Sequence, residues 1–462
     1  MITRRAFVKT LGVGVATALA SKLLAARAKR QPPNILFILA DDLGWRDLGC
    51  YGHEIHETPN IDRLAGQGMR FTDAYAACPI CGPSRCAIMT GKFPSRTGFV
   101  DNFIDREKRI QQFMKLKEFT LAEALKVGGY QTGFVGKWHL SASDTERLPT
   151  DQGFDVNVAG CSWGHPLKGY FAPYGIPAPG FKEGPKGEYL TDRLTTEAIR
   201  VMDEFSKQDK PWLLYTSYYT VHGPFNSKPE KIKKYQDKAR KAKVKIKSAA
   251  YAGMVESLDE NVGRMLDWLE EKGLRKNTII IFTSDNGGMV RATENWPLRG
   301  YKGELYEGGI RVPCIIDWPG VIKPGSACDT PMHGVDFYAT LLAMTGLPQQ
   351  PENHQDSVNL LPLLKGDADF DRGPMVWYYP VAVPHIRHSK PGSVIRIGDW
   401  KYIQFYEDGC RELYNLKDDI GETKNLVNSM PGKAAEMKAQ LEVMLKEHGA
   451  KIAAPDPAYT KK

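Results

Sequence analysis

The sequence predicts an α/β fold in which helices sandwich a large, mostly parallel sheet. Four apolar runs, at residues 34–40, 131–136, 211–216 and 277–283, have the length and composition of strands. Continuous apolar runs are typical of strands that are buried on both faces. Helical stretches separate the runs, and alternation of strand and helix favours parallel pairing in a layered α/β domain.

The longest helical pattern lies at residues 251–269, between the third and fourth predicted strands. Apolar side chains recur there every three or four residues, which places them on one face of a helix. A shorter pattern at residues 121–129 precedes the second strand and ends in two glycines, as helices often do. The apolar face of the longer helix consists of Met254, Leu258, Val262, Leu266 and Leu269.

The pattern changes near residue 366, after which the predicted elements become shorter. Strand-like runs joined by turns, and then a helical pattern, occupy residues 394–397, 400–405, 412–416 and 433–448. Short strands joined by tight turns favour antiparallel pairing. We therefore expect a large α/β domain at residues 33–366 and a small α+β domain, an antiparallel sheet with one helix, at residues 367–462.

The N-terminal residues have the pattern of an export signal. Arg4 and Arg5 stand before an apolar stretch at residues 11–20, and "ARA" at 26–28 fits a cleavage site between small residues. The apolar stretch is shorter than the roughly 20 residues that a membrane-spanning helix needs. The prediction is a twin-arginine signal at residues 1–28, recognised by the bacterial twin-arginine export machinery, with no stable membrane anchor. The mature protein would be periplasmic or secreted.

The composition is that of a globular protein. The chain has 462 residues, 42% hydrophobic and 25% charged, with a formal net charge of +8. Much of the positive excess lies at residues 228–247, which favours a solvated surface helix over contact with a polyanionic substrate. Basic residues are not interleaved with aromatic ones, so no nucleic acid is expected as a partner. Eight cysteines are too few for a disulfide scaffold in this length.

Polar side chains follow each of the four predicted strands. In open α/β sheets, ligands bind beyond the carboxyl ends of the strands. We therefore expect these side chains to converge on one site. They are Asp41 and Asp42, Lys137 and His139, His222, and Asp285 and Asn286.

The acidic pairs among them suggest a metal site. Asp41, Asp42, Asp285 and Asn286 offer only oxygen ligands, which suit a hard cation such as Ca²⁺ or Mg²⁺ rather than zinc or copper. Asp, Asn and Gly also favour turns, and turn chemistry would explain one such segment alone. Two acidic pairs, each directly after a buried strand, favour the metal.

Three cysteines fall within nine residues, at Cys78, Cys81 and Cys86. A zinc knuckle would need a second cysteine pair at ligand spacing, and Cys78/Cys81 has none downstream. A redox pair would open a helix early in a small βαβ domain, whereas this domain is large. We expect structural roles for Cys78 and Cys86.

The sequence around Cys81 resembles the signature of the type I sulfatases. "CGPSR" at residues 81–85 is followed by "MTGK" at 89–92, and other segments resemble the family, in order, along nearly the whole mature chain. They include "NILFILADDLG", "GKWHL", "VHGPF", "NTIIIFTSDNGG", "YKGELYEGGIRVP" and "ELYNLKDDIGETKNL". The resemblance implies a member of the alkaline phosphatase superfamily that hydrolyses sulfate esters. It also implies that a separate maturation enzyme oxidises Cys81 to formylglycine.

The resemblance further implies roles for the site residues. The metal, usually calcium in the family and less often magnesium, would be held by Asp41, Asp42, Asp285, Asn286 and modified Cys81. The residues around the aldehyde would be Arg85 and Lys137, which hold its hydrate, and His139, which acts as a base on it. His222 and Lys302 would grip the sulfate ester and assist departure of the alcohol.

Substrate specificity is expected in loops at the rim of the site. Residues 161–175 and 376–392 are rich in aromatic and basic side chains, with His385 and Arg387 in the second segment. They suit a sulfated sugar, and a packed domain interface about equally well. The family often has a serine or histidine that binds sulfate in the first segment, so Ser162 and His165 are both candidates.

Two other functions are open alternatives to a carbohydrate sulfatase. One is a phosphodiester or phosphonate monoester hydrolase on the same scaffold. The other is an unmodified protein that binds sulfated glycans without cleaving them.

Overall fold

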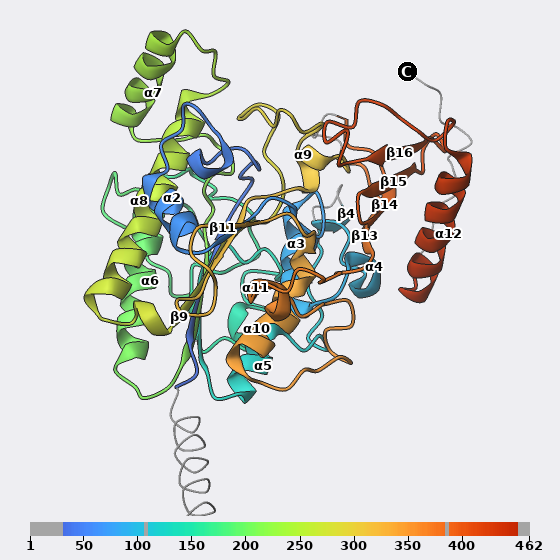
Figure 1. The fold of residues 1–462 in the computed structure, drawn as a ribbon. Helices are drawn as coiled ribbons and strands as arrows, with labels where there is room; N and C mark the ends of the chain where they lie inside the picture. Colours follow the sequence, from blue (N-terminus) through green and yellow to red (C-terminus); the bar gives the residue numbers. More distant parts are fainter. Residues whose placement is uncertain (1–30, 106–109, 384–387, 451–462) are drawn as a thin grey trace, which may run out of the picture.

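The computed structural model describes residues 31–105, 110–383 and 388–450 (Figure 1). The expected export signal at residues 1–28 lies outside the described residues, and so do His385 and Arg387.

An eight-stranded sheet runs through the larger part of the described chain, in the order β11-β2-β10-β9-β1-β8-β6-β7. β10 is antiparallel to both of its neighbours, and the other pairs are parallel. The expected, mostly parallel sheet is therefore confirmed. Its strands are β1 (Asn34–Ala40), β2 (Met69–Phe71), β6 (Gln131–Gly136), β7 (Val156–Val158), β8 (Trp212–Ser217), β9 (Thr278–Ser284), β10 (Cys314–Asp317) and β11 (Ser326–Cys328).

Helices cover both faces of this sheet (Figure 1). Alternate residues of β1 divide between two cores: Leu36 and Ile38 face one, and Ile35, Phe37 and Leu39 face the other. All five are fully buried, which is worth roughly 2 kcal/mol for each side chain. The first core contains α2 (Pro59–Gln67), α6 (Leu190–Ser206) and α8 (Ala249–Glu271). The second contains α3 (Cys81–Thr90), α5 (Leu121–Val127) and α10 (Phe337–Thr345).

The two helices predicted in detail are present. The apolar face expected for α8 is buried along its whole length. The helix begins at Ser248, whose side chain accepts a hydrogen bond from Tyr251 N at 3.1 Å and so satisfies a free N–H of the first turn. The other α-helices and strands described in this part are α4 (Pro94–Thr97), α7 (Pro229–Ala242), α9 (Glu307–Ile310), α11 (Leu361–Leu364), β3 (Ala74–Tyr75), β4 (Phe103–Asp105), β5 (Ile110–Gln111) and β12 (Met332–His333).

A smaller antiparallel sheet with one helix forms the C-terminal part, as expected. It consists of β13 (Met375–Tyr379), β14 (Gly392–Ile397), β15 (Trp400–Phe405), β16 (Arg411–Asn415) and α12 (Pro431–Glu447). In the segment 376–392, the residues of β13 are packed in an interface within the protein and are not exposed at the rim of the site. Trp377 is buried, and its Nε1 donates to Ala76 O at 2.7 Å, close to the segment that leads into α3.

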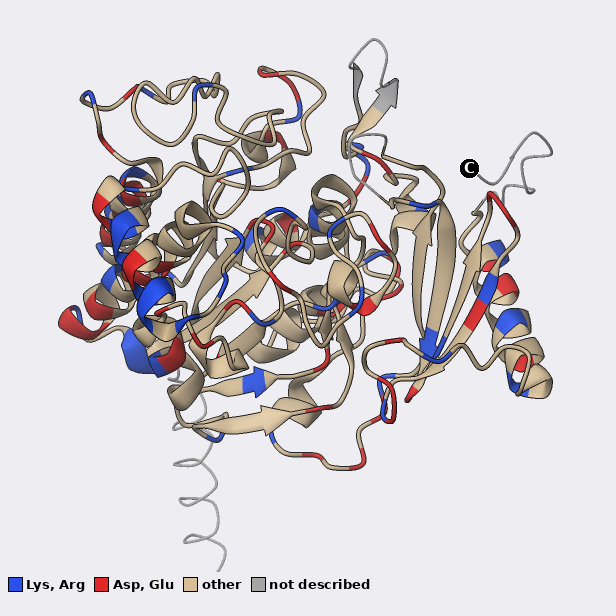
Figure 2. Ribbon diagram, turned by 90° about the horizontal axis from the view of Figure 1, so that it is seen from above, with Lys and Arg blue, Asp and Glu red and all other residues tan. Residues whose placement is uncertain are grey.

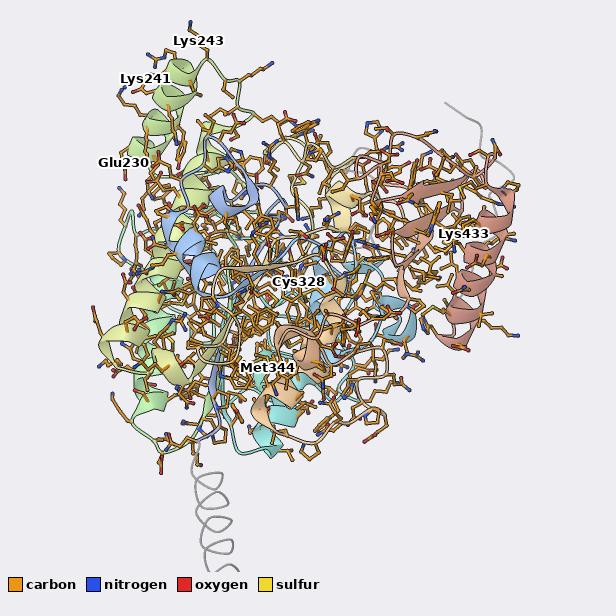
Figure 3. The ribbon with its side chains drawn as sticks, viewed as in Figure 1. Glu230, Lys241, Lys243, Cys328, Met344 and Lys433 are labelled. Atoms are coloured by element: carbon orange, nitrogen blue, oxygen red, sulfur yellow. The ribbon has the colours of Figure 1, made fainter. Side chains whose placement is uncertain are left out.

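The basic stretch at residues 228–247 forms α7 and the segment that follows it. Acidic and basic positions lie side by side on the helices at this edge (Figure 2), and Lys231 Nζ lies 2.6 Å from Glu260 Oε2. Glu230, Lys241 and Lys243 extend outward from α7 (Figure 3). The solvated surface helix is therefore confirmed.

The eight cysteines all lie in the described residues, and none of them forms a disulfide. Among the helices that the structure describes, none is long and apolar enough to cross a membrane.

Candidate active site

Four adjacent strands bring the predicted site residues to one edge of the sheet. β9, β1, β8 and β6 are parallel neighbours, so their carboxyl ends meet at the same edge. Backbone hydrogen bonds fix the segments that follow them: Asp41 N donates to Thr220 O at 3.0 Å, and Asp285 N donates to Ala40 O at 3.2 Å. The convergence expected from the sequence is found.

Buried ion pairs occupy this edge. Lys137 Nζ lies 2.7 Å from Asp41 Oδ2, and Lys302 Nζ lies 2.6 Å from Asp42 Oδ1. All four side chains are at most 6% exposed. Charges this deep in a protein persist only when they are paired. The positive charges of the lysines thus balance the negative charges of two carboxylates that are predicted to bind a metal.

Arg85 joins several strand ends to helix α3. Its Nε donates to Asp285 Oδ2 at 2.8 Å, and its Nη1 donates to Lys137 O at 2.9 Å and to Ser217 Oγ at 2.5 Å. Its Nη2 lies 3.6 Å from Asp41 Oδ1. A guanidinium offers five donors in one rigid plane, so arginine suits this position better than lysine.

Cys81 is the first residue of α3 and is 2% exposed. Its Sγ and one carboxylate oxygen each of Asp41 and Asp285 all lie within 4.8 Å of one another. The positive end of the helix dipole also faces this point. The side chain of Cys81 therefore lies where a cation bound by the carboxylates could reach it.

The donor set fits a hard metal ion. Asp41 Oδ1, Asp42 Oδ2 and Asn286 Oδ1 are buried and have no hydrogen-bond partner among the described residues. Asn286 Nδ2 donates to Asp42 Oδ1 at 2.8 Å and to Gly287 O at 2.9 Å, which leaves its Oδ1 free to act as a ligand. Buried oxygens without partners are costly unless an ion or water satisfies them. The group is therefore a possible metal site with oxygen ligands.

Neighbouring cations keep two of the carboxylates ionised. Burial alone would raise the pKa of Asp42, but Lys302 and the other nearby basic groups together outweigh it, and the pKa lies below its ordinary range. Burial likewise opposes ionisation of Asp285, but Arg85 and the neighbouring lysines together hold the pKa of that carboxyl below its ordinary value. Metal ligands must be deprotonated, so both carboxylates are ready to bind an ion.

The two site histidines are neutral. Burial lowers the pKa of His139 well below its usual range and that of His222 to about 3, and neighbouring lysines add to both effects. His222 Nδ1 lies 2.7 Å from Gly223 O and acts as a donor to it, so its Nε2 carries the free lone pair. That Nε2 lies 3.7 Å from Asp42 Oδ2. His139 Nδ1 is buried without a hydrogen-bond partner in the described part of the chain.

The segment around residues 161–165 covers these histidines. Gly164 packs on His139 so closely that a Cβ there would lie 2.6 Å from the imidazole Cε1. The rings of His165 and His222 are nearly parallel, with centroids 6.1 Å apart. Ser162 instead donates its hydroxyl to Asp144. Of the two candidates for this segment, His165 lies beside His222, whereas Ser162 is engaged elsewhere.

Two family models match this chain. A model described as Sulfatase matches residues 33–347, and a model described as N-sulphoglucosamine sulphohydrolase, C-terminal, matches residues 301–451. The chain belongs to the sulfatase family.

Known relatives of this sulfatase are similar to it over most of their length. A sulfatase of Formosa agariphila is 31% identical over 94% of this chain and 93% of its own. Arylsulfatase A of Homo sapiens is 31% identical over 96% of each chain. The solved structure of Ps i-CgsB in complex with k-i-k-neocarrahexaose matches with a TM-score of 0.80 and 29% identity, over 92% of this chain and 96% of that one. The sulfatase chemistry predicted from the sequence is thus shown at the level of the family, whose members hydrolyse sulfuric esters.

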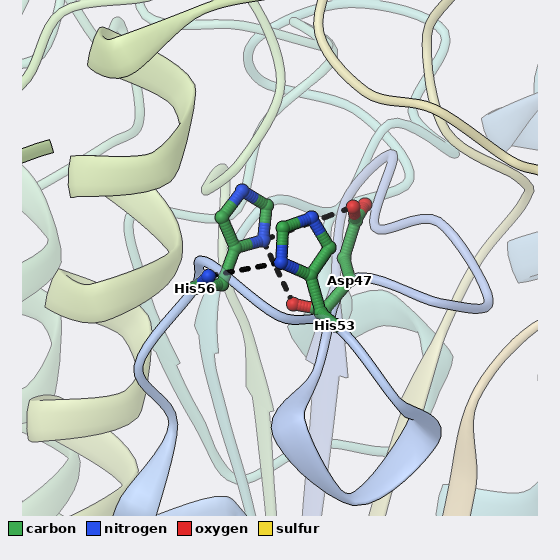
Figure 4. A group of neighbouring side chains, drawn as sticks. All are labelled: Asp47, His53 and His56. Carbon is green, nitrogen blue, oxygen red and sulfur yellow. Dashed lines mark hydrogen bonds and ion pairs between the residues drawn. The ribbon is translucent and has the colours of Figure 1, made fainter. Parts of the chain in front are cut away.

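A second group of potential ligands in this sulfatase, Asp47, His53 and His56, lies outside the site (Figure 4). The two imidazoles stack with centroids 3.5 Å apart and planes within 9° of parallel, so they cannot both direct a nitrogen at one ion. His56 Nδ1 already lies 2.9 Å from Asp47 O. Asp47 Oδ2 accepts hydrogen bonds from Gly44 N at 2.7 Å and Tyr251 OH at 2.6 Å. The group supports the turn that follows Asp42.

Three residues near the sulfatase site were not identified from the sequence. Ser217, the last residue of β8, directly follows the strand that was predicted at residues 211–216, and its hydroxyl accepts a hydrogen bond from Arg85, so its position was a usable signal. Asn102 Nδ2 lies 3.8 Å from Cys81 Sγ, and Asp144 holds Ser162. Neither of these two follows a predicted strand or belongs to a motif, so no local pattern marks them.

Proposed function

We propose that this sulfatase hydrolyses the sulfate ester of a sulfated carbohydrate, with formylglycine made from Cys81 and with Ca²⁺ as its metal. The observation that carries the proposal is the position of Cys81. Its Sγ lies at a helix N-terminus within 4.8 Å of metal-ligand oxygens of Asp41 and Asp285. Arg85, which binds Asp285, stands one turn further along the same helix.

The metal would be held by Asp41, Asp42, Asp285, Asn286 and the modified residue 81. Bound Ca²⁺ would supply positive charge that polarises an oxygen of residue 81 and of the sulfate. Magnesium is less suited, because it demands a tighter octahedral set and gives up its water reluctantly.

Formylglycine in its hydrated form supplies two hydroxyls on one carbon, one to attack sulfur and one whose deprotonation then releases sulfate. Arg85 and Lys137 hold this group in place. His139 accepts its proton, since that imidazole is neutral and its Nδ1 is without a partner among the described residues. An unmodified serine or cysteine has a single nucleophilic atom and would stay sulfated until a slow hydrolysis.

His222 and Lys302 bind the sulfate ester and assist the leaving alcohol. Lys302 is buried beside Asp42, so its ammonium is held where negative charge develops on sulfate oxygens. Burial and Lys302 depress the pKa of His222. An anionic ester beside His222 raises its pKa, which allows it to carry the proton that the departing alcohol needs.

The relatives and the rim of the site support a sulfated carbohydrate as the substrate. N-acetylgalactosamine-6-sulfatase of Mus musculus is 34% identical over 77% of this chain and 70% of its own. Ps i-CgsB was solved with a carrageenan oligosaccharide. His165 beside His222 provides a further basic group for sulfate at the rim. His385 and Arg387 are proposed to contact the sugar as well.

The proposal also includes the order of maturation and export of the chain. The twin-arginine signal at residues 1–28 would deliver a folded protein to the periplasm or the medium, so the maturation enzyme must oxidise Cys81 in the cytoplasm first. Cys81 oxidised only in the exported pool would contradict this order.

Mass spectrometry of the tryptic peptide 71–85, from protein purified from its own host, tests the proposal. An aldehyde at position 81 that a hydrazine reagent traps is the expected result, together with turnover of an aryl sulfate. Cys81→Ala serves as the control that cannot form the aldehyde. An aldehyde with faster turnover of an aryl phosphate diester would favour the phosphoester hydrolase. A plain thiol, with glycan binding and no turnover after treatment with a maturation enzyme, would favour the unmodified binder.

A further inference from the structure

Asn102 contacts Cys81 from a loop that belongs to no recognised motif. Its Oδ1 accepts a hydrogen bond from Gly82 N at 3.0 Å, and its Nδ2 lies 3.8 Å from Cys81 Sγ. The N–H of Gly82 lies in the first turn of α3, where backbone donors have no partner within the helix. Ile80, at the N-cap, has no polar side-chain atom that could accept it. Asn102 therefore caps this helix from another part of the chain.

The cap determines which way the amide points. Only the oxygen of Asn102 can accept from Gly82 N–H, so its NH₂ group must face Cys81. The loop is fixed in turn by Gln112: its N donates to Asn102 O at 2.9 Å, and its Oε1 accepts from Asp101 N at 3.0 Å. The donor beside Cys81 is therefore held at both its backbone and its side chain.

Glycine at position 82 makes this approach possible. A Cβ at Gly82 would lie 2.6 Å from Asn102 Oδ1 and 3.1 Å from the ring of Phe99. Any larger residue there would push Asn102 away from Cys81. The absence of a side chain at Gly82 thus leaves the space that the Asn102 side chain occupies.

We propose that Asn102 orients the nucleophile by donating a hydrogen bond to an oxygen that replaces Cys81 Sγ; this inference rests on the proposed function. Oxygen accepts an amide hydrogen bond better than sulfur and at a shorter distance, about 2.9 Å. Asp41 and Asp285 lie close to the same sulfur on the side of the proposed metal. A hydroxyl held by Asn102 would restrict the rotation of residue 81, and the carboxylates of Asp41 and Asp285 lie within 4.8 Å of the atom that this oxygen replaces.

The test compares wild type with Asn102→Asp, Asn102→Ala and Gly82→Ala. Asp keeps the oxygen that caps α3 but loses the donor, Ala loses both, and Gly82→Ala displaces an intact Asn102 without adding charge. Asn425→Asp is the matched control, because Asn425 makes the same kind of paired contact in the C-terminal sheet. Formylglycine content is measured first in each protein, and rates are expressed per modified site. We expect kcat on an aryl sulfate to fall at least tenfold in the three variants, with KM changed less than threefold, and to stay unchanged in the control.

Carbon-13 NMR of protein labelled at the cysteine β-carbon gives a readout independent of activity. The oxidised carbon of residue 81 resonates far from the carbons of the seven other cysteines. Wild type is expected to give one sharp signal from it, and the three variants broadened or multiple signals. Variants with wild-type kcat and a single sharp signal would overturn the inference and leave the proposed function standing. Wild-type protein without an oxidised carbon at position 81 would overturn both.

Discussion

Replacing Lys302 with methionine is expected to tighten metal binding and to slow turnover. Lys302 Nζ lies 2.6 Å from Asp42 Oδ1, an oxygen of a proposed metal ligand. Ca²⁺ bound at about 2.4 Å to Asp42 Oδ2, the oxygen without a partner among the described residues, would lie no more than about 7 Å from the ammonium group. At an effective dielectric constant of about 20, the repulsion between them at that distance is roughly 5 kcal/mol. Methionine keeps the bulk of the side chain and removes the charge.

Only part of this energy is expected to appear as affinity. In the metal-free variant, burial favours uptake of a proton by Asp42, because its main counterion is gone. We therefore expect the dissociation constant for Ca²⁺ to fall at least tenfold, which corresponds to about 1.4 kcal/mol. Turnover is expected to fall roughly 100- to 1000-fold, because one group aimed at developing charge contributes about 3–4 kcal/mol.

Calorimetric titration of chelator-treated protein with Ca²⁺ measures the first effect, and kcat on an aryl sulfate measures the second. Lys365→Met removes a charge from an exposed lysine and serves as the control. Weaker Ca²⁺ binding in Lys302→Met, with the control unchanged, would refute the reasoning. It would mean that Lys302 holds the Asp42 carboxylate in place for metal binding and does not repel the ion.

Three further predictions concern stability and the metal. Burial lowers the pKa of His56 to about 4, below its unfolded value of about 6.5, so its contribution to stability is intact above pH 6.5 and is lost as the pH falls. From pH 7 to 5 the loss is about 2 kcal/mol, and urea unfolding of His56→Asn should depend less on pH over this range. Lys401→Met should lower the free energy of unfolding by about 3–5 kcal/mol, because Lys401 is fully buried between Glu307 and Glu422, at 2.9 and 2.8 Å; an unchanged melting temperature would contradict this. Chelation with EDTA should lower both melting temperature and activity, and Ca²⁺ should restore them at lower concentration than Mg²⁺; better restoration by Mg²⁺ would reverse the metal assignment.

The strands that carry the site were predictable because their burial leaves a strong pattern. β1 and β9 are buried at every position and apolar through their middle residues, since both faces of the sheet are covered. β10 and β11 have four and three residues, too few for a periodic signal, and the antiparallel direction of β10 depends on its partners alone. β13 was ambiguous because aromatic side chains suit an interface and a sugar-binding rim equally well.

The site was predictable where function follows from position on a strand. Asp41 directly follows β1 and His139 comes three residues after β6, so the fold class alone places them at one edge. Asn102 could not be found in this way, because its contact with Cys81 depends on the path of a loop held by Gln112. The choice between Ser162 and His165 likewise depended on a tertiary contact, the hydroxyl of Ser162 being taken by Asp144.

The charges of the site explain why metal and substrate binding should depend on each other. Lys137 is paired with Asp41 and Lys302 with Asp42, so the carboxylates proposed to bind the metal also hold the cations proposed to bind sulfate. A dication bound to these carboxylates would weaken their attraction for both lysines and add a charge of +2 to the group. The lysines could then bind an anionic ester, whose negative charge offsets the positive charge that the ion adds.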